Sequence, residues 1–252
     1  MNVIFDEERF SRNVLLNGIG FDGQAKILNS SVACVGSGGL ASHVLPILAS
    51  CGVGKLAIID FDEIASSNLP RQTMFREQDL GLKKVDCAKK FLLERNSSCK
   101  IEAICENGGN VLHKIAQNYD VILDLTDSLA SRLNSNKVSL EFQKPFFTGS
   151  ARGFAGHVYS FGNHINSQKT PCYACLFDDI SEKEVTQMQG LGVFPPIVEI
   201  IGGFISANVL KYLAGIELDF QEFLILDIIN GNKKTKILKD TQCKACGKSL
   251  NT

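Results

Sequence analysis

The sequence predicts an α/β protein with one doubly wound, mixed sheet, parallel in its N-terminal part and antiparallel in its C-terminal part. Short apolar runs alternate with helical patterns from residue 31 to residue 148, as in βαβ units with right-handed crossovers. The turn Gly36-Ser37-Gly38-Gly39 follows the first apolar run and precedes the first helical pattern. After Gly149, polar and apolar residues alternate, which is typical of antiparallel strands. Together these observations indicate a Rossmann-like fold.

The individual elements are expected from hydrophobic period and turn residues. Residues 6–28 have the spacing of two short helices with a break at Phe21-Asp22-Gly23. A strongly apolar helix at 197–215 carries small residues suited to close packing against the sheet or a second subunit. Residues 162–196 show no clear period, and we expect a crossing loop at 178–195. The expected strands are 31–35, 56–60, 101–105, 121–125, 145–148, 153–161, 223–229 and 233–238, and the other expected helices are 41–51, 83–95, 111–118 and 129–142.

We expect these elements to form a single domain over residues 1–252. The length of 252 residues and the hydrophobic content of 44% are sufficient for one large core. The domain divides into an N-terminal helical arm at 1–29, a βαβ part at 30–150 and a C-terminal part at 151–252.

Composition excludes two classes of partner from the prediction. The formal net charge is −1 and no run of Lys and Arg exceeds two residues, so we expect no nucleic-acid partner. The N-terminus lacks a cationic start followed by an apolar stretch, and no uninterrupted apolar run reaches about 18 residues. We therefore expect no membrane partner and a cytoplasmic location.

Residues near the second expected strand point to a nucleotide. Asp60 ends that strand, and Asn68 and Arg71 follow within eleven residues. Backbone N–H groups of the glycine turn and the N-terminus of the next helix can approach phosphate oxygens. An acid at a strand end can hold ribose hydroxyls, and a guanidinium matches phosphate geometry. An NAD(P)-dependent oxidoreductase would use the glycine turn and the acid but not Arg71, so the pattern favours ATP and leaves the oxidoreductase as the alternative.

The nine cysteines fall into two groups. Five of them have apolar neighbours and are expected to be buried in the core. The other four form two Cys-x-x-Cys pairs, which as thiolates would bind zinc tetrahedrally with no open position, as in a structural clip. A redox Cys-x-x-Cys is the competing interpretation. The five expected core cysteines are Cys34, Cys51, Cys87, Cys99 and Cys105, and the paired ones are Cys172, Cys175, Cys243 and Cys246.

Several motifs occur in a fixed order along almost the whole chain, at residues 9–16, 36–40, 60–62, 67–72, 81–85, 124–127, 171–175 and 243–247. With these motifs the sequence resembles the ThiF/MoeB/HesA adenylyltransferases, relatives of the catalytic domains of ubiquitin-activating enzymes. The resemblance implies the Rossmann-like fold with its helical arm, a four-cysteine zinc clip, and a carrier-binding role for part of residues 151–252.

The resemblance also implies a role for each matching residue. Asp60 holds the ribose, Asn68, Arg71 and Lys84 hold the triphosphate, and Asp127 lies beside the α-phosphate and magnesium. Arg12 reaches into the site of a partner subunit, which implies a homodimer with composite active sites. The implied catalytic residues are Arg71, Asp127, Arg12 and Lys84, and the implied nucleotide-binding residues are Gly36, Gly38, Gly39, Asp60, Asp62, Asn68, Arg71, Gln72, Lys84 and Asp127.

The implied reaction transfers AMP from ATP to a protein carboxylate and requires Mg²⁺. A family member of this kind forms an acyl-adenylate on the C-terminal glycine of a small ubiquitin-like sulfur-carrier protein in molybdopterin or thiamine biosynthesis. Other peptide or carrier C-termini, and a catalytically silent scaffold, are the remaining alternatives.

The chain departs from the family pattern at several positions. Met188 stands where some members carry a cysteine that links to the carrier, so we expect sulfur from a separate persulfide donor. Ser128 replaces the usual Asn after Asp127, His157 replaces a common Gln, and Pro70 replaces Gln before Arg71.

Overall fold

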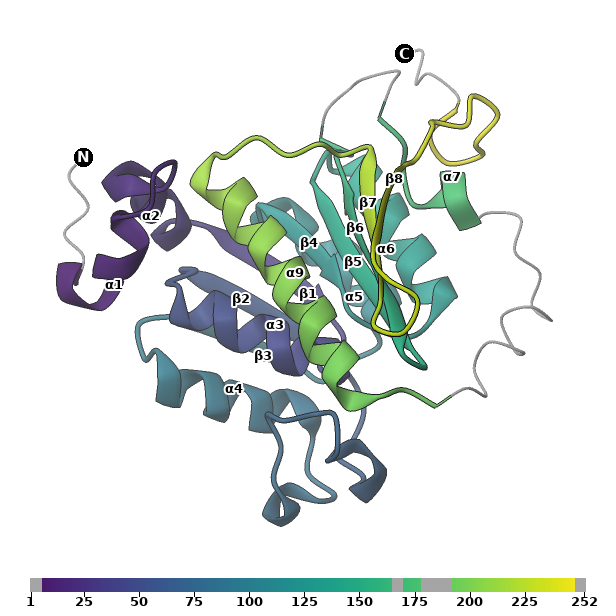
Figure 1. The fold of residues 1–252 in the computed structure, drawn as a ribbon. Helices are drawn as coiled ribbons and strands as arrows, with labels where there is room; N and C mark the ends of the chain where they lie inside the picture. The colour runs from purple at the N-terminus through teal and green to yellow at the C-terminus, as the bar shows by residue number, and fades with distance from the viewer. Residues whose placement is uncertain (1–5, 165–169, 178–191, 248–252) are drawn as a thin grey trace.

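The computed structural model contains one eight-stranded sheet with helices on both faces (Figure 1). It describes residues 6–164, 170–177 and 192–247. The strands are β1 (Ser31–Val35), β2 (Lys55–Ile59), β3 (Lys100–Ile104), β4 (Val121–Asp124), β5 (Phe146–Arg152), β6 (Ala155–Phe161), β7 (Glu222–Asp227) and β8 (Lys233–Lys236). The α-helices are α1 (Glu7–Val14), α2 (Gly20–Leu28), α3 (Gly39–Ser50), α4 (Lys84–Arg95), α5 (Gly108–Ile115), α6 (Leu129–Glu141), α7 (Ala174–Phe177) and α9 (Pro195–Ala214), and short 3-10 helices are η1 (Ser66–Asn68), η2 (Glu77–Asp79) and η3 (Ala116–Asn118).

The strand order β3-β2-β1-β4-β5-β6-β7-β8 confirms the predicted mixed sheet. Strands β1 to β5 pair in parallel, and β5 to β8 pair antiparallel. The chain leaves β1 toward β2 on one side, and β4 joins β1 on the other side, which makes β1/β4 the topological switch point. Val35 is opposite both Ile59 and Asp124, so β1, β2 and β4 end at the same edge of the sheet. In such sheets ligands bind outside these carboxyl ends.

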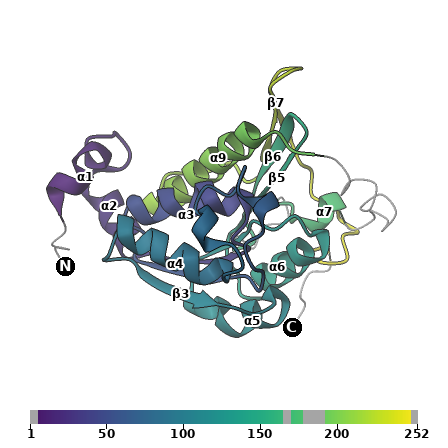
Figure 2. The ribbon, with the colours of Figure 1, turned by 90° about the horizontal axis from the view of Figure 1, so that it is seen from below.

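The core consists of two apolar clusters, one on each face of the sheet. One cluster packs α2, α3, α4 and α9 against the sheet, and the other packs α5 and α6 against the opposite face. Figure 2 shows α3 and α9 on one side and α5 and α6 on the other. Alternate residues along each strand serve the two clusters, as with Val32 and Ala33 in β1. Burial on both faces explains why the central strands are continuous apolar runs.

Helix α9 lies against α3, β5 and β6 on one face of the sheet. It is the one helix in the described part of the chain that is long and apolar enough to cross a membrane by length and composition, with half of its apolar window buried. Gly202 permits close packing, because a Cβ there would lie 2.7 Å from the Cβ of His43 on α3. Gly202 therefore packs against α3, whereas Gly203 has no atom within 4 Å of an added Cβ and Ala207 is exposed.

The expected break in the helical arm is wrong in position. Helix α1 ends at Val14 and α2 begins at Gly20, so Phe21-Asp22-Gly23 lies inside α2. The turn between the helices uses Gly18 and Gly20, which have φ of 95° and 57°. Gly23 instead serves packing, because a Cβ there would lie 3.4 Å from Ala214 of α9.

The structure also bears on the expected end of β5, the burial of the five unpaired cysteines and the expected crossing loop. Strand β5 extends to Arg152 rather than ending at Thr148, because its last residues pair with β6. Cys34 and Cys99 are buried and Cys51 and Cys87 are half-buried, but the prediction for Cys105 is wrong: it is exposed because β3 ends one residue earlier. The expected crossing loop at 178–195 lies outside the described residues except for 192–195, and Met188 lies outside them too.

Candidate nucleotide site and metal centre

The glycine turn leaves the carboxyl end of β1 and packs against two neighbouring segments. Gly36 has φ of 90°, and a Cβ there would lie 2.9 Å from Cγ2 of Thr126, in the loop after β4. A Cβ on Gly38 would lie 3.5 Å from Nε2 of Gln72, and one on Gly39 would lie 3.7 Å from Cγ of Arg71. The absence of side chains thus brings the turn, the loop after β4 and residues 71–72 together at the sheet edge.

Asp60 ties the end of β2 to the glycine turn. Its Oδ2 accepts hydrogen bonds from the Ser37 N–H at 2.7 Å and the Ser37 hydroxyl at 3.0 Å, and its Oδ1 accepts from the Asp62 N–H at 2.9 Å. Oδ2 thus accepts two hydrogen bonds, and Oδ1 accepts one and can accept another. Asp60 therefore has a structural role in the turn and is only half-buried, with acceptor capacity left for a ligand.

Lys84 presents a buried positive charge at the start of α4. Its Nζ lies 2.7 Å from Oδ2 of Asp62, and its side chain is 7% exposed. The Lys84 N–H also donates to the Asp62 carbonyl. The pair fixes the compact charge of the ammonium group in one place, as a phosphate site requires.

The segment after η1 supplies the other predicted triphosphate ligands. The Asn68 Oδ1 accepts from the Ala65 N–H at 3.1 Å, which shapes the turn, and the Arg71 Nη1 donates to the Ser67 carbonyl at 2.8 Å. Gln72 is 4% exposed, and its Oε1 is buried without a hydrogen-bond donor among the described residues. Buried polar atoms in folded proteins nearly always have a partner, so this oxygen fits a site completed by a ligand or water.

Two functional positions were missed by the sequence analysis. The fully buried Asp124 at the end of β4 accepts from the N–H and hydroxyl of Thr126 and from the hydroxyls of Ser131 and Ser135. Arg132 donates from Nε at 3.1 Å and from Nη2 to the Thr126 carbonyl. These contacts fix the loop that carries the exposed Asp127. The sequence signal was an acid closing an all-apolar strand, with serines at helical spacing on the next helix.

Arg12 lies at the opposite edge of the sheet from Arg71. The arm packs on residues just before β2, because a Cβ on Gly52 would lie 2.9 Å from the Phe10 ring. The Arg9 side chain donates to the carbonyl of Arg95, at the end of α4 remote from Lys84. At about 1.5 Å per residue, α4 separates these ends by roughly 16 Å. Within one protomer the exposed Arg12 therefore does not join the other predicted site residues.

Two titratable groups near the site are held neutral. Burial, with the charges of Asp124 and Asp60, raises the pKa of the Cys34 thiol, so it is not a nucleophile. Burial, with the charges of Arg132 and Arg152, lowers the pKa of His157. Neither group therefore adds a charge to the site at neutral pH.

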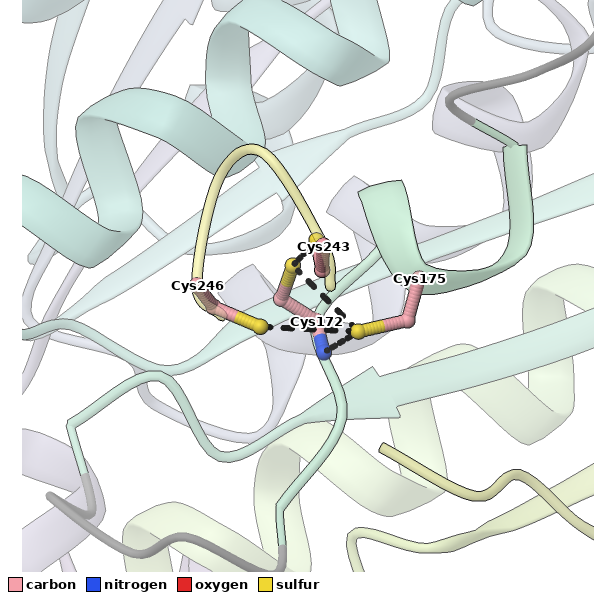
Figure 3. A group of neighbouring side chains, drawn as sticks. All are labelled: Cys172, Cys175, Cys243 and Cys246. Carbon is pink, nitrogen blue, oxygen red and sulfur yellow. Dashed lines mark hydrogen bonds between the residues drawn. The ribbon is translucent and has the colours of Figure 1, made fainter. Parts of the chain in front are cut away.

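The four paired cysteines converge, as Figure 3 shows, from the segment that leads into α7 and from the C-terminal tail. Their Sγ atoms lie within 4.8 Å of one another, with separations of 3.4 Å for Cys175–Cys246 and 3.8 Å for Cys172–Cys243. A tetrahedron with Zn–S bonds of about 2.3 Å has edges of about 3.8 Å. Hydrogen bonds from Cys172 and Cys246 lower the pKa of the Cys175 thiol. Both spacing and donor chemistry fit a tetrahedral Cys₄ metal site.

Comparison with known proteins places this architecture in a family. A model of the ThiF family matches residues 10–246. The chain belongs to the ThiF family. This ThiF-family chain is 32% identical over 246 residues to the Sulfur carrier protein ThiS adenylyltransferase of Escherichia coli (strain K12), over 97% of this chain and 96% of the relative.

Two further relatives define the extent of the likeness. The ThiF-family chain is 35% identical over 250 residues to Adenylyltransferase and sulfurtransferase MOCS3 of Drosophila willistoni, covering 96% of this chain and 53% of the relative. It therefore spans about half the length of that protein. The crystal structure of E. coli MccB with ATP aligns with a TM-score of 0.79 and 25% identity, covering 96% of this chain and 75% of that chain.

Proposed function

We propose that this protein is an ATP-dependent adenylyltransferase that forms an acyl-adenylate on the C-terminal glycine of a small ubiquitin-like sulfur-carrier protein. The observation that carries the proposal is the convergence of the glycine turn, Asp60, Arg71, Lys84 and the loop of Asp127 at the carboxyl ends of β1, β2 and β4. The two sequence relatives described above are both named adenylyltransferases, and the MccB structure contains ATP.

Glycine, acidic and basic residues contact different parts of ATP. The glycine turn and the N-terminus of α3 face the phosphates with N–H groups. Asp60 holds the ribose, Asn68, Arg71 and Lys84 hold the triphosphate, and the Gln72 oxygen accepts a hydrogen bond from the ligand or from a water bound with it. Asp127 would hold Mg²⁺, which would supply positive charge to the bound triphosphate. Arg71 provides a planar fork and Lys84 a point charge.

The chemical step needs alignment rather than proton transfer. An oxygen of the carrier carboxylate attacks the α-phosphorus, the bond from that phosphorus to the bridging oxygen breaks, and pyrophosphate leaves. A C-terminal carboxylate has a pKa of about 3.3 to 3.7 and is already ionised, so no base is required. Arg71 and Lys84 neutralise the charge that develops on the leaving phosphates.

The carrier and the pathway belong to the same proposal. The relatives' names point to a ThiS-like carrier or to sulfur transfer of the MOCS3 type, hence to thiamine or molybdopterin biosynthesis. We place the reaction in the cytoplasm and expect sulfur to come from a separate persulfide donor. The four cysteines hold Zn²⁺ as a structural clip between the segment before α7 and the tail.

Mass spectrometry of candidate carriers tests the reaction. Incubation with the protein, MgATP and inorganic pyrophosphatase should add one AMP to the cognate carrier, and a carrier that lacks its last glycine should stay unchanged. Arg71→Ala should slow the reaction by about 10² to 10³, as expected for loss of a transition-state donor. An oxidoreductase would instead be stabilised by NADH rather than ATP in a thermal-shift comparison, and that result would overturn the proposal.

Arg12 tests the proposed homodimer. Because Arg12 and Arg71 lie at opposite sheet edges, a complete site takes Arg12 from one subunit and Arg71 from the other. In an equal mixture of Arg12→Ala and Arg71→Ala chains, about half of the dimers are mixed, and each mixed dimer has one complete site. The mixture should therefore recover about a quarter of wild-type activity, while each variant alone is slowed by about 10² to 10³. Activity no higher than that of the separate variants would exclude a shared site.

A further inference from the structure

A buried polar network lies beneath the four-cysteine cluster. Its centre is Asn136 on α6, which is 1% exposed. The Asn136 Nδ2 donates to Sγ of Cys172 at 3.6 Å. Asn163 donates to Asn136 at 3.2 Å and to the Ser139 hydroxyl at 2.8 Å. The network thus joins α6, the segment after β6 and the cysteine segment.

The orientation of the Asn136 amide follows from its partners. Its Oδ1 accepts from the Tyr173 N–H at 2.9 Å and from the Asn163 Nδ2 at 3.2 Å. A flipped amide would place its NH₂ group against two donors, and the Tyr173 N–H has no other orientation. The Nδ2 group must therefore face Cys172.

A hydrogen-bond donor at this position affects the charge and the orientation of the Cys172 thiolate. Cys172 is buried, so water does not supply hydrogen bonds to its Sγ in place of Asn136. A hydrogen bond to a thiolate stabilises its negative charge and fixes its direction, and partners of this kind tune metal affinity. Within the part of the chain that the structure describes, the Cys172 thiol is the one in the cluster that accepts a hydrogen bond from a side-chain amide.

We propose that Asn136 is the positioning residue of the metal centre: its N–H holds the Cys172 thiolate in the direction of the metal and raises the affinity of the cluster for zinc. The inference rests on the proposal that the four thiols hold Zn²⁺. It assigns Asn136 a role in metal retention that is separate from its two accepted hydrogen bonds, which support the fold.

Asn136→Asp separates these two roles. Aspartate keeps the shape and both acceptor bonds, and it puts a carboxylate oxygen with a like charge in place of the N–H that faces sulfur. The matched control is Asn163→Ala, which removes two hydrogen bonds of the same network and leaves the N–H···S contact in place. Zinc affinity is measured by competition with a chromogenic chelator, and the Co²⁺-substituted proteins are compared by absorption spectroscopy.

We expect Asn136→Asp to bind zinc about 10- to 100-fold more weakly than wild type, the range typical for loss of such partners. Its thiolate-to-Co²⁺ charge-transfer band should move to lower energy, because the sulfur lone pair is no longer stabilised. Asn163→Ala should keep wild-type zinc affinity and band position. Equal zinc affinity in all three proteins, or an equal loss in both variants, would overturn the role of Asn136.

A measurement on the wild-type chain tests the inference even if a variant fails to fold. In ¹⁵N-labelled, ¹¹³Cd-loaded protein, the Asn136 side-chain proton should show scalar coupling to cadmium through the Cys172 sulfur. A loaded cluster without that coupling would refute the inference and leave the metal proposal standing. Wild-type protein that binds neither Zn²⁺ nor Cd²⁺ would refute both.

Discussion

Replacement of Asp124 by Asn tests whether the buried carboxylate at the end of β4 holds the loop of Asp127. The Asp124 Oδ1 accepts from the Thr126 N–H at 3.1 Å and hydroxyl at 2.6 Å, and its Oδ2 accepts from Ser131 at 2.7 Å and Ser135 at 2.8 Å. Asparagine has the same shape, but a nitrogen replaces one oxygen. It is expected at the Oδ2 position, because the serine hydroxyls can rotate to accept whereas the Thr126 N–H remains a donor.

The magnitude follows from these four bonds. A hydrogen bond to an ionised group contributes about 1.5 to 3 kcal/mol and a neutral one about 0.5 to 1.5 kcal/mol, so four bonds together lose on the order of 4 kcal/mol. Relief of the desolvation of a buried charge offsets part of this loss, while Arg132 loses a nearby opposite charge. We expect a net fall in the free energy of unfolding of about 2 to 4 kcal/mol, or roughly 5 to 15 °C in Tm for a chain of this size.

Urea unfolding followed by circular dichroism measures this change. The matched control is Ser135→Ala, which removes one of the four bonds without changing charge and should cost about 1 to 2 kcal/mol. MgATP affinity, measured by calorimetry, should fall more in Asp124→Asn than in the control, because the loop of Asp127 loses its anchor. Asp124→Asn with a free energy of unfolding within about 0.5 kcal/mol of wild type would refute the reasoning.

Three further predictions concern the glycine turn, pH and the metal. Gly36→Ala should lower Tm and weaken MgATP binding, because φ is 90° and the new Cβ would lie 2.9 Å from Thr126. The control Gly203→Ala should do neither, since no atom lies within 4 Å of the added Cβ. Equal effects of the two substitutions would contradict the packing argument. Burial lowers the pKa of His157, so the unfolded chain binds the proton more tightly and stability should fall as pH drops below about 6.5. His157→Gln should reduce the fall of Tm at low pH, and an unchanged profile of Tm against pH would contradict this contribution. Removal of zinc by a chelator should expose the C-terminal tail to limited proteolysis while adenylation continues, and an unchanged digestion pattern would argue against the clip.

Periodicity and turn chemistry were sufficient to predict the sheet. The alternation of apolar runs and helices predicted the parallel strands, because a strand buried on both faces is an apolar run. The change to alternating residues after Gly149 predicted the antiparallel strands, because alternation is typical of a strand buried on one face. Local breaks were harder to place. Phe21-Asp22-Gly23 has the composition of a turn, yet it lies inside α2, where Gly23 is buried and packs beside Ala214 of α9.

The site could be predicted only where a residue's chemistry is visible in sequence. Glycines, Asp60 and Arg71 have recognisable spacing, and the structure brings them to one sheet edge. Asp124 was missed because an acid at the end of an apolar strand is usually exposed to solvent. Its burial depends on hydrogen bonds from the hydroxyls of Ser131 and Ser135 on α6, and these contacts form only in the folded chain. Arg12 was predicted as a site residue, but within one chain it lies at the edge of the sheet remote from Arg71.

Isotope exchange between labelled pyrophosphate and ATP tests the central claim most directly, namely that the carboxyl ends of β1, β2 and β4 bind MgATP and activate a carboxylate. We expect exchange that requires both Mg²⁺ and the cognate carrier, and that falls by about 10² to 10³ in Arg71→Ala. Exchange that proceeds within a few-fold of wild type in Arg71→Ala, or none with a carrier that the protein binds, would contradict the account.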